Sequence, residues 1–493
     1  MVEILNKGML ENGTPGKLPE KVLQFGTGVL LRGLPDYFIE QANRQGLFNG
    51  RIVVVKSTGQ GTTDEFERQD GLYTLHIKGL QHGKAVQERM LVSAISRVLH
   101  AASQWEEIKK VAVSPEVSVV VSNTTEVGIV LDEKDDLGAA PPSSFPGKLT
   151  ALLYHRFRHF NGDPEMGWVI LPTELISDNG SQLKHIVLQL AQRHNLGDAF
   201  TAWLEEACDF CNTLVDRIVP GKLTPADAAA QEAQLGYRDE LAIMAEPFRL
   251  WAVEADSERV RRRLSFAAAD AGMVIAPDIR KFKELKLRLL NGTHTFSCAL
   301  AILCGFTTVK EAMQDAVFAR YVSQLMRREI VPAIVGGPIS EGEALAFADS
   351  VIDRFSNPFL DHRWLSISMN FTSKMRMRNV ALLQRYIDRR QQPPKRMALG
   401  FSAYLLFMKG TAAGGEEPYA IQDEHAGYFA DAWNGGDHRQ VVDTVLRNES
   451  LWGVDLSQWE AFAGLVKHGL GQLLEGNALE LIKQQETSQT FSE

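Results

Sequence analysis

A short apolar run that leads directly into a glycine turn is the feature that most constrains this fold. Residues 22–25 read Val-Leu-Gln-Phe; Gly26, Thr27 and Gly28 follow at once, and an apolar helical pattern runs from about residue 30 to 43. Glycines at such a turn let the backbone approach a pyrophosphate, and the N-terminus of the following helix offers free N–H groups. The segment predicts a dinucleotide-binding turn, although Leu31 occupies the third glycine position of the usual pattern, and an ordinary glycine-rich turn is the alternative.

Three more mostly β-branched runs, at residues 52–55, 117–121 and 168–171, follow in the first third of the chain. Their apolar character suits strands covered on both faces, and helical patterns such as residues 94–111 lie between several of them. This alternation indicates an α/β sheet. Beyond residue 183 the pattern is mostly helical, apart from one short strand expected at 273–275. Because a chain of 493 residues exceeds one hydrophobic core, we expect an α/β domain over residues 1–277 and a mainly α-helical domain over 278–493.

Polar residues follow the second and third predicted strands. Lys56 stands where NAD sites often carry an acid; a lysine there would tolerate a 2′-phosphate, so the choice between NAD and NADP stays open, and a solvated lysine is the alternative. Asn123 and Thr124 follow the third strand, at the edge where such sheets bind ligands. The candidate cofactor-binding residues are Phe25, Gly26, Thr27, Gly28, Leu31, Arg32, Lys56, Asn123 and Thr124.

The sharpest candidate for catalysis is the set Lys286, Asn291 and His294. At about 100° per residue, the three side chains fall within an arc of about 140° on one helix. A lysine can move a proton near neutral pH when its surroundings lower its pKa, and an asparagine amide can stabilise an oxyanion. His294 could orient the same substrate oxygen. The alternative is that Asn291 and Gly292 form a turn, which would scatter the three side chains.

The net charge and the cysteine content limit the classes of partner that we expect for this chain. A net charge of −9 disfavours nucleic acid, because the chain as a whole has no basic field to replace counterions. Cys208 and Cys211 form a single C-x-x-C without a second pair, so packing is favoured over a metal or redox role. The sequence lacks an apolar run of membrane-spanning length and an N-terminal signal pattern. We expect a cytoplasmic monomer or small homo-oligomer whose partner is a small molecule.

The spacing of Lys286, Asn291 and His294 resembles the signature of the long-chain polyol dehydrogenases, the family that includes mannitol dehydrogenase. The resemblance extends over about residues 20–380. Its supporting stretches are Gln24–Gly28 with Leu31 and Arg32, Ser122–Glu126, Leu171–Ile176 with Asn179 and Gly180, Thr213–Ile218 and Leu290–Thr295. It implies a Rossmann-type N-terminal domain, a mainly α-helical C-terminal domain, an active site between them, NAD as the cofactor and no metal.

The resemblance also implies roles for single residues. Lys286 corresponds to the family's general acid/base and Asn291 to its oxyanion-stabilising asparagine, with Asn179 matched to a second such asparagine. Lys374 corresponds to a substrate-binding lysine. Apart from the resemblance, Asp216 and Arg217 are expected to form structural ion pairs near the cleft, and the alternative is a role in positioning the catalytic lysine; Asp216 is kept as a candidate substrate-binding residue.

Two departures from the family pattern bear on the substrate. Lys283 stands where the polyol-oxidising relatives carry an acid. Ser366 falls near the position at which those relatives have a substrate-binding arginine. A substrate with a carboxylate would instead pair with Lys374, Arg376 or Arg378. We therefore expect hydride transfer between NAD and an open-chain sugar acid. The alternatives are the same reaction on a stereoisomeric sugar acid, a polyol dehydrogenase, and a non-catalytic dinucleotide-binding sensor.

Overall fold

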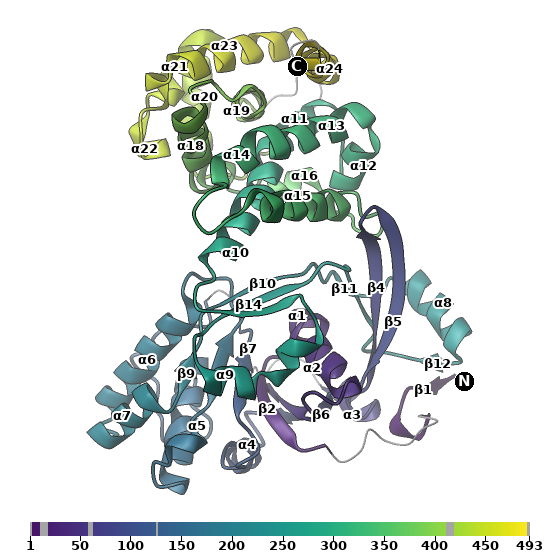
Figure 1. Ribbon diagram of the computed structural model, residues 1–493, viewed down its shortest axis with the longest axis vertical. Coiled ribbons are helices and arrows are strands. Elements are labelled where there is room, and N and C mark those ends of the chain that lie inside the picture. Colours follow the sequence, from purple (N-terminus) through teal and green to yellow (C-terminus); the bar gives the residue numbers. More distant parts are fainter. Residues whose placement is uncertain (1, 10–17, 58–62, 125–126, 411–418, 491–493) are drawn as a thin grey trace. The chain divides into compact units, whose positions relative to one another are not determined.

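The computed structural model describes residues 2–9, 18–57, 63–124, 127–410 and 419–490 (Figure 1). The chain forms two compact units. Unit 1 comprises residues 1–78 and 85–279, and unit 2 comprises residues 79–84 and 280–493. The hairpin loop 79–84 groups with unit 2, where the Gly83 N–H donates a hydrogen bond to Asp353 Oδ1 at 2.9 Å. The sequence pattern did not predict this excursion of the chain.

A six-stranded parallel sheet forms the centre of unit 1 (Figure 1). Numbered by their order along the chain, the six strands lie across the sheet in the order 3-2-1-4-5-6, which is the order of a Rossmann fold. The order changes direction between the first and the fourth strands. The expected α/β, Rossmann-type class is therefore confirmed. In sheet order, the strands are β6 (Ile95–His100), β3 (Arg51–Lys56), β2 (Glu20–Phe25), β7 (Val119–Ser122), β8 (Val169–Pro172) and β9 (Asp209–Phe210).

Both faces of this sheet are buried, which explains why the strands read as continuous apolar runs. Alternate residues of one strand enter different cores, as Val22 and Leu23 do in β2. Helix α2 (Pro35–Arg44) contributes to the first core. The second core takes its helical side chains from α4 (Trp105–Ala112), α5 (Phe145–His159), α6 (Asn179–Arg193) and α7 (Asp198–Glu206).

The structure corrects the expected helix over residues 94–111. Residues Ile95–His100 form the edge strand β6, which pairs with β3, and helix α4 begins only at Trp105. Pairing with a distant strand overrides the local helical pattern here, and Ile95 and Val98, both β-branched, suit a strand.

Strands are also more frequent after residue 183 than the sequence pattern indicated. A three-stranded sheet joins β10 (Thr213–Asp216), β14 (Leu250–Glu254) and β15 (Met273–Ala276). A four-stranded sheet joins β11 (Gly221–Lys222), β13 (Ile243–Ala245), β4 (Tyr73–Gln81) and β5 (Lys84–Val92). Most of these strands are too short for a period-2 signal, and several find partners far away in the chain.

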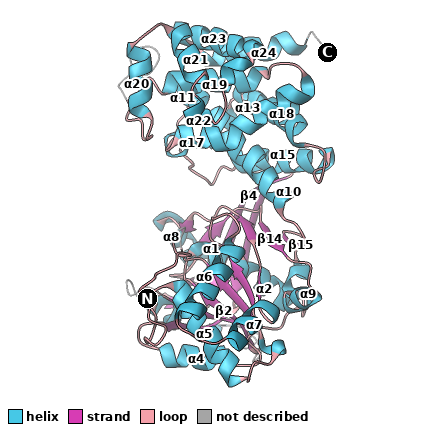
Figure 2. Cartoon of the chain, turned by 90° about the vertical axis from the view of Figure 1, so that its left-hand side faces the viewer, coloured by secondary structure: helices cyan, strands magenta, loops and turns pink. Residues whose placement is uncertain are grey.

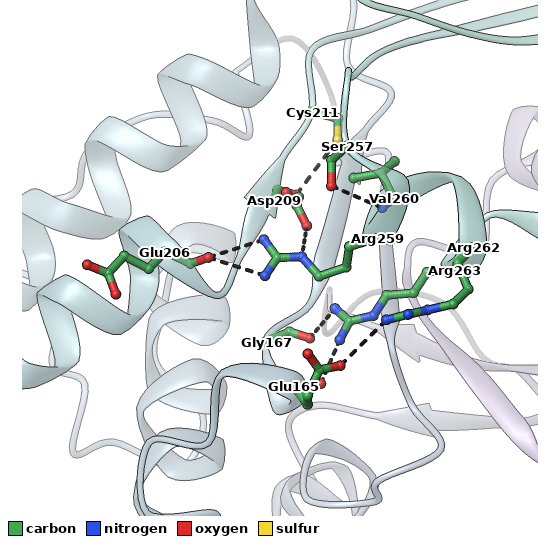
Figure 3. Close-up of polar contacts among 10 residues, drawn as sticks. All are labelled: Glu165, Gly167, Glu206, Asp209, Cys211, Ser257, Arg259, Val260, Arg262 and Arg263. Atoms are coloured by element: carbon green, nitrogen blue, oxygen red, sulfur yellow. Dashed lines mark hydrogen bonds and ion pairs between the residues drawn. The ribbon is translucent and has the colours of Figure 1, made fainter.

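The basic helix α9 (Glu258–Arg263) is anchored to the edge of the central sheet (Figure 3). Arg259 pairs with Asp209 of β9 at 2.7 Å, and Arg263 donates to the carbonyl oxygens of Gly167 and Glu165, both at 2.6 Å. Arg262 adds a longer contact to the Glu165 carboxylate at 3.5 Å. This arginine-rich run therefore holds unit 1 together.

The C-x-x-C pair lies beside this anchor. The Cys211 thiol donates to the carbonyl oxygen of Asp209 at 3.9 Å, and both cysteines are buried (Figure 3). Burial raises the pKa of Cys208 and of Cys211 to about 12, so both are neutral thiols at physiological pH. Their geometry is that of packed core residues.

From Arg280 onward, the described residues form helices joined by loops (Figure 2). Helix α19 (Lys395–Phe407) runs through the core of unit 2, and every residue from Arg396 to Phe407 is buried. At Gly400 an added Cβ would lie 2.6 Å from the Phe296 carbonyl oxygen, so only glycine permits the close approach of α11 (Thr293–Leu303). No helix of the described residues is long and apolar enough to cross a membrane.

Candidate functional site

The glycine turn after β2 lies at the point where the sheet reverses its strand order. Gly26 has φ of +130°, and an added Cβ would lie 2.9 Å from Leu31 Cδ1 and 3.0 Å from the Asn123 carbonyl oxygen. Gly28 precedes helix α1 (Val29–Gly33) with φ of −65°, and apart from Gly28 itself and its chain neighbours no atom of the described residues lies within 4 Å of its ideal Cβ position. Gly26 is thus needed for the turn itself, whereas Gly28 leaves its backbone open to a close ligand. Both features fit a bound pyrophosphate.

Four of the predicted cofactor residues have buried side chains in unit 1. Phe25 and Leu31 are fully buried in the two cores. Arg32 is buried too; its Nη1 donates to the Leu241 carbonyl oxygen at 2.6 Å, and burial lowers its pKa. Lys56 is 7% exposed at the end of β3. The side chains of Leu31 and Arg32 thus pack inside unit 1, and contact of these residues with the cofactor stays a prediction.

The loop after β7 is held by a residue that the sequence analysis did not single out. Glu174 is buried and accepts hydrogen bonds from Thr124 N (2.9 Å), Thr124 Oγ1 (2.9 Å) and Ser122 Oγ (3.1 Å). Asn123 Nδ2 donates to Thr173 Oγ1 at 3.0 Å. Burial raises the pKa of the Glu174 carboxyl, and the hydrogen bonds that it accepts from Thr124 and Ser122 oppose this rise. Its position two residues after the buried strand β8 is the signal that could have identified it.

Thr125 and Glu126, at the end of the stretch Ser122–Glu126, lie outside the described residues.

Asn179 serves the backbone of unit 1. Its side chain is 1% exposed at the start of α6, where Nδ2 donates to the carbonyl oxygens of Pro172 and Glu174, both at 3.1 Å. Its Oδ1 accepts from the N–H groups of Gly180 and Thr213, both at 2.9 Å. Because the amide is committed to main-chain groups, the geometry favours a positioning role over the catalytic role expected for Asn179.

Asp216 and Arg217 are both buried at the end of β10. Arg217 donates to the Gly33 carbonyl oxygen at 2.7 Å and to that of Glu246 at 2.9 Å, and its guanidinium lies 4.6 Å from the centre of the Tyr37 ring. Burial lowers the pKa of Arg217 to about 10. Arg217 thus ties β10 to the helix that follows the glycine turn.

In unit 2, Lys286 and Asn291 lie on a π-helical turn. The chain runs without a break from α10 (Arg280–Leu285) through the π-helix η4 (Lys286–Gly292) into α11, so the expected alternative of a turn at Asn291 is excluded. In an α-helix, residues five apart point about 140° away from each other. A π-helix bonds residue i to residue i+5 and so brings such a pair closer to one face of the helix. The π-helical geometry thus aligns Lys286 and Asn291 more closely than the sequence analysis assumed.

His294 follows on α11 as a buried, neutral ring. It stacks on Phe355, with ring centres 4.0 Å apart and an interplanar angle of 8°, and it meets the His362 ring edge-on at 5.3 Å. Burial, and then the nearby His362, hold the pKa of His294 well below its usual range. Its Nε2 has no hydrogen-bond partner within the described residues. A neutral imidazole can orient a substrate oxygen without taking up its proton.

Two of the three candidate basic residues lie near this ring. Lys374, in α17 (Phe371–Met375), donates to the Ile367 carbonyl oxygen at 2.9 Å. Arg378, in the π-helix η6 (Arg376–Val380), donates to Thr295 Oγ1 at 3.2 Å. Arg376 is exposed and turns away, with Nη1 3.4 Å from the Ser450 carbonyl oxygen. Arg378 is thus the arginine whose contact lies next to His294 in the chain, whereas the role predicted for Arg376 stays a prediction.

A second residue missed from the sequence links the two π-helices. Arg288 is buried; its Nε donates to Glu284 Oε1 at 3.0 Å, and its Nη1 donates to the carbonyl oxygens of Met377 (3.1 Å) and Arg378. It lies two residues after Lys286. The only sequence signal was an arginine within an otherwise apolar stretch of helix.

Comparisons with known proteins cover nearly the whole chain. The family model of the mannitol dehydrogenase Rossmann domain matches residues 20–265, and that of the mannitol dehydrogenase C-terminal domain matches residues 278–474. An altronate oxidoreductase of Bacillus subtilis is 39% identical over 457 residues, 92% of each chain. One of Bacteroides thetaiotaomicron is 38% identical over 486 residues, 98% of this chain and 99% of the relative. The solved ternary complex of Pseudomonas fluorescens mannitol 2-dehydrogenase with NAD and D-mannitol has a similar fold, with a TM-score of 0.67 and 22% identity over 98% of this chain and 99% of that one.

Proposed function

This chain belongs to the mannitol dehydrogenase family, and on that premise we propose that it is a tagaturonate reductase, which interconverts D-tagaturonate and D-altronate with NAD. The names of the two altronate oxidoreductases support this substrate, since each matches more than nine-tenths of the chain. The structural observation that carries the proposal is the alignment of Lys286 and Asn291 on one π-helical turn.

Lys286, Asn291 and His294 each have a role in the proposed reaction. Reduction of a ketone requires a hydride at carbon and a proton at oxygen. Bound NADH supplies the hydride. The Lys286 ammonium gives its proton to the oxygen and recovers it when the alcohol is oxidised. The Asn291 amide N–H donates to the same oxygen as negative charge develops on it, and the neutral His294 holds that oxygen in place.

The residues of unit 1 fit a dinucleotide. Gly28 leaves its backbone open at the switch point of the sheet, and the loop held by Glu174 borders the same point. Lys56 is buried, so it does not offer a solvated ammonium to a 2′-phosphate, which favours NAD over NADP. The mannitol 2-dehydrogenase of similar fold was solved in complex with NAD, which supports the same choice.

An absorbance assay of reduced cofactor tests the proposal directly. Initial rates are measured with D-tagaturonate, D-fructuronate and D-mannitol, each with NAD(H) and NADP(H). We expect the highest kcat/KM with D-tagaturonate and NADH. A higher value with D-fructuronate would assign the sister reaction, and a higher value with mannitol would make the chain a polyol dehydrogenase.

Substitution of the proposed acid/base tests the mechanism. Lys286→Met should lower kcat by a factor of about 10³ or more, while the NADH dissociation constant from fluorescence titration stays unchanged. Lys281→Met is the matched control, because Lys281 is a half-buried lysine on the preceding helix that pairs with Glu343 at 2.8 Å. Retained turnover in Lys286→Met would remove Lys286 from the mechanism.

A further inference from the structure

Lys374 and Arg378 lie four residues apart, on one face of the continuous helix formed by α17 and η6. Arg378 is half-buried, and its Nη1 reaches Thr295 Oγ1 at 3.2 Å. Thr295 Oγ1 in turn donates to the Asn291 carbonyl oxygen at 2.8 Å. A short chain of hydrogen bonds therefore holds the Arg378 guanidinium one helical turn from Asn291.

Among the residues that the structure describes, these two cations lack an anionic partner. Neither Lys374 nor Arg378 forms an ion pair with a described carboxylate, and their side-chain hydrogen bonds within this part of the chain go to Ile367 and Thr295. Burial lowers the pKa of Arg378, and burial followed by the charge of Arg378 lowers the pKa of Lys374. Partly buried positive charges without a counter-ion cost free energy, which an anionic ligand would recover.

The free edge of Arg378 matches one kind of anion. With Nη1 on Thr295, Nε and Nη2 have no hydrogen-bond partner within the described residues. These two N–H groups point along one edge of a planar fork, the arrangement that binds both oxygens of a carboxylate. Arg376, two residues earlier, has its contact at Ser450 instead.

We propose that Arg378 binds the substrate carboxylate through two hydrogen bonds, with Lys374 as the second charge, and thereby makes the enzyme select a sugar acid over the neutral sugar. This proposal rests on the function proposed above, because it takes the acid as the substrate. It goes further in naming the residue that sets the specificity.

The test compares an acid with its neutral counterpart. D-Tagatose carries a hydroxymethyl group where D-tagaturonate carries the carboxylate, so the ratio of kcat/KM for the two ketones measures recognition of the charge. In Arg378→Met this ratio should fall by a factor of about 10² to 10³, the effect of removing a bidentate charged partner, while kcat/KM for tagatose changes little. Arg378→Lys should recover only part of the ratio, because a lysine is a point charge without a fork.

Two controls separate charge recognition from distortion of the site. Thr295→Val removes the hydroxyl that positions Arg378 but keeps the guanidinium, so it should lower the ratio less than Arg378→Met does. Any effect transmitted through Asn291 should instead lower both ketone activities alike. Arg376→Met removes an exposed arginine from the same helix and should leave both activities unchanged.

Free guanidinium ion should restore activity of Arg378→Ala toward tagaturonate and not toward tagatose.

The outcomes distinguish this proposal from the function on which it rests. If the wild-type enzyme reduces tagaturonate and Arg378→Met keeps the wild-type ratio, Arg378 does not read the carboxylate and only this inference fails. If the wild-type enzyme turns over neither ketouronate, the proposed function fails first and takes this inference with it.

Discussion

Nη1 of Arg288, on the helical turn that carries Lys286, donates a hydrogen bond to the main-chain carbonyl oxygen of Met377 at 3.1 Å. The same nitrogen reaches the next carbonyl, that of Arg378. One buried side chain thus ties the π-helix of the proposed acid/base to the π-helix of the proposed carboxylate ligand. Carbonyl oxygens displaced from regular α-helical bonding need such donors, because an unsatisfied buried acceptor costs about 1–3 kcal/mol.

Arg288→Met should both destabilise unit 2 and impair catalysis. We expect the free energy of unfolding in urea to fall by about 2–4 kcal/mol, because two carbonyl oxygens and Glu284 lose a buried partner. We also expect a lower kcat/KM for the acid substrate. Arg385→Met is the control; Arg385 shares Glu284 from a more exposed position, and its loss should cost less than about 1 kcal/mol. An unchanged urea midpoint together with unchanged kcat/KM in Arg288→Met would contradict this role.

The two glycines of the cofactor turn should respond differently to alanine. Gly26→Ala forces a side chain into a positive φ and against the Asn123 carbonyl oxygen, so we expect a loss of about 1–3 kcal/mol in stability. Gly28→Ala fits the fold and should leave the free energy of unfolding within about 0.5 kcal/mol. It should still raise the NADH dissociation constant about tenfold or more, because the methyl group occupies the open backbone. Equal NADH affinity in Gly28→Ala and wild type would place the pyrophosphate elsewhere.

Glu174→Gln should loosen the loop after β7. The amide keeps one acceptor oxygen but places an NH₂ group where Glu174 accepts hydrogen bonds from Ser122 and Thr124. The mismatch of donors should cost about 1–3 kcal/mol. Thermal unfolding with and without NADH measures the loss of stability. A separate assay measures the KM for NADH, which should rise. A melting temperature equal to that of wild type in both conditions would show that the carboxylate is not needed.

His294 should make stability depend on pH below about 6.5. The folded ring stays neutral because its pKa is well below 6.5, whereas in the unfolded chain the ring gains a proton near that pH. The unfolded state then binds more protons, so the free energy of unfolding falls as pH falls, by at most about 1.4 kcal/mol per pH unit, and is unaffected above that range. Urea unfolding at pH 7.5 and 5.5 should show a larger loss for wild type than for His294→Gln. Equal losses would mean that His294 titrates alike in both states.

The local sequence of this chain determined its fold class and predicted its catalytic residues. Apolar runs followed by helical patterns specify an α/β sheet, and the glycine turn after residue 25 predicts where that sheet binds a ligand. The spacing of Lys286, Asn291 and His294 places them on one helix. These features are local, since strand and helix periodicity is written in neighbouring residues.

Only the tertiary structure decided which polar side chains remain for substrate and cofactor. It committed Asn179 and Arg32 to main-chain groups, placed Arg376 beside the Ser450 carbonyl oxygen, and left Arg378 without a counter-ion among the described residues. It also made residues 95–100 a strand and aligned Lys286 with Asn291 through a π-helical turn. Several of these outcomes depend on partners distant in the chain: Arg32 contacts Leu241, Arg376 contacts Ser450, and residues 95–100 pair with β3. No local window of the sequence contains those contacts.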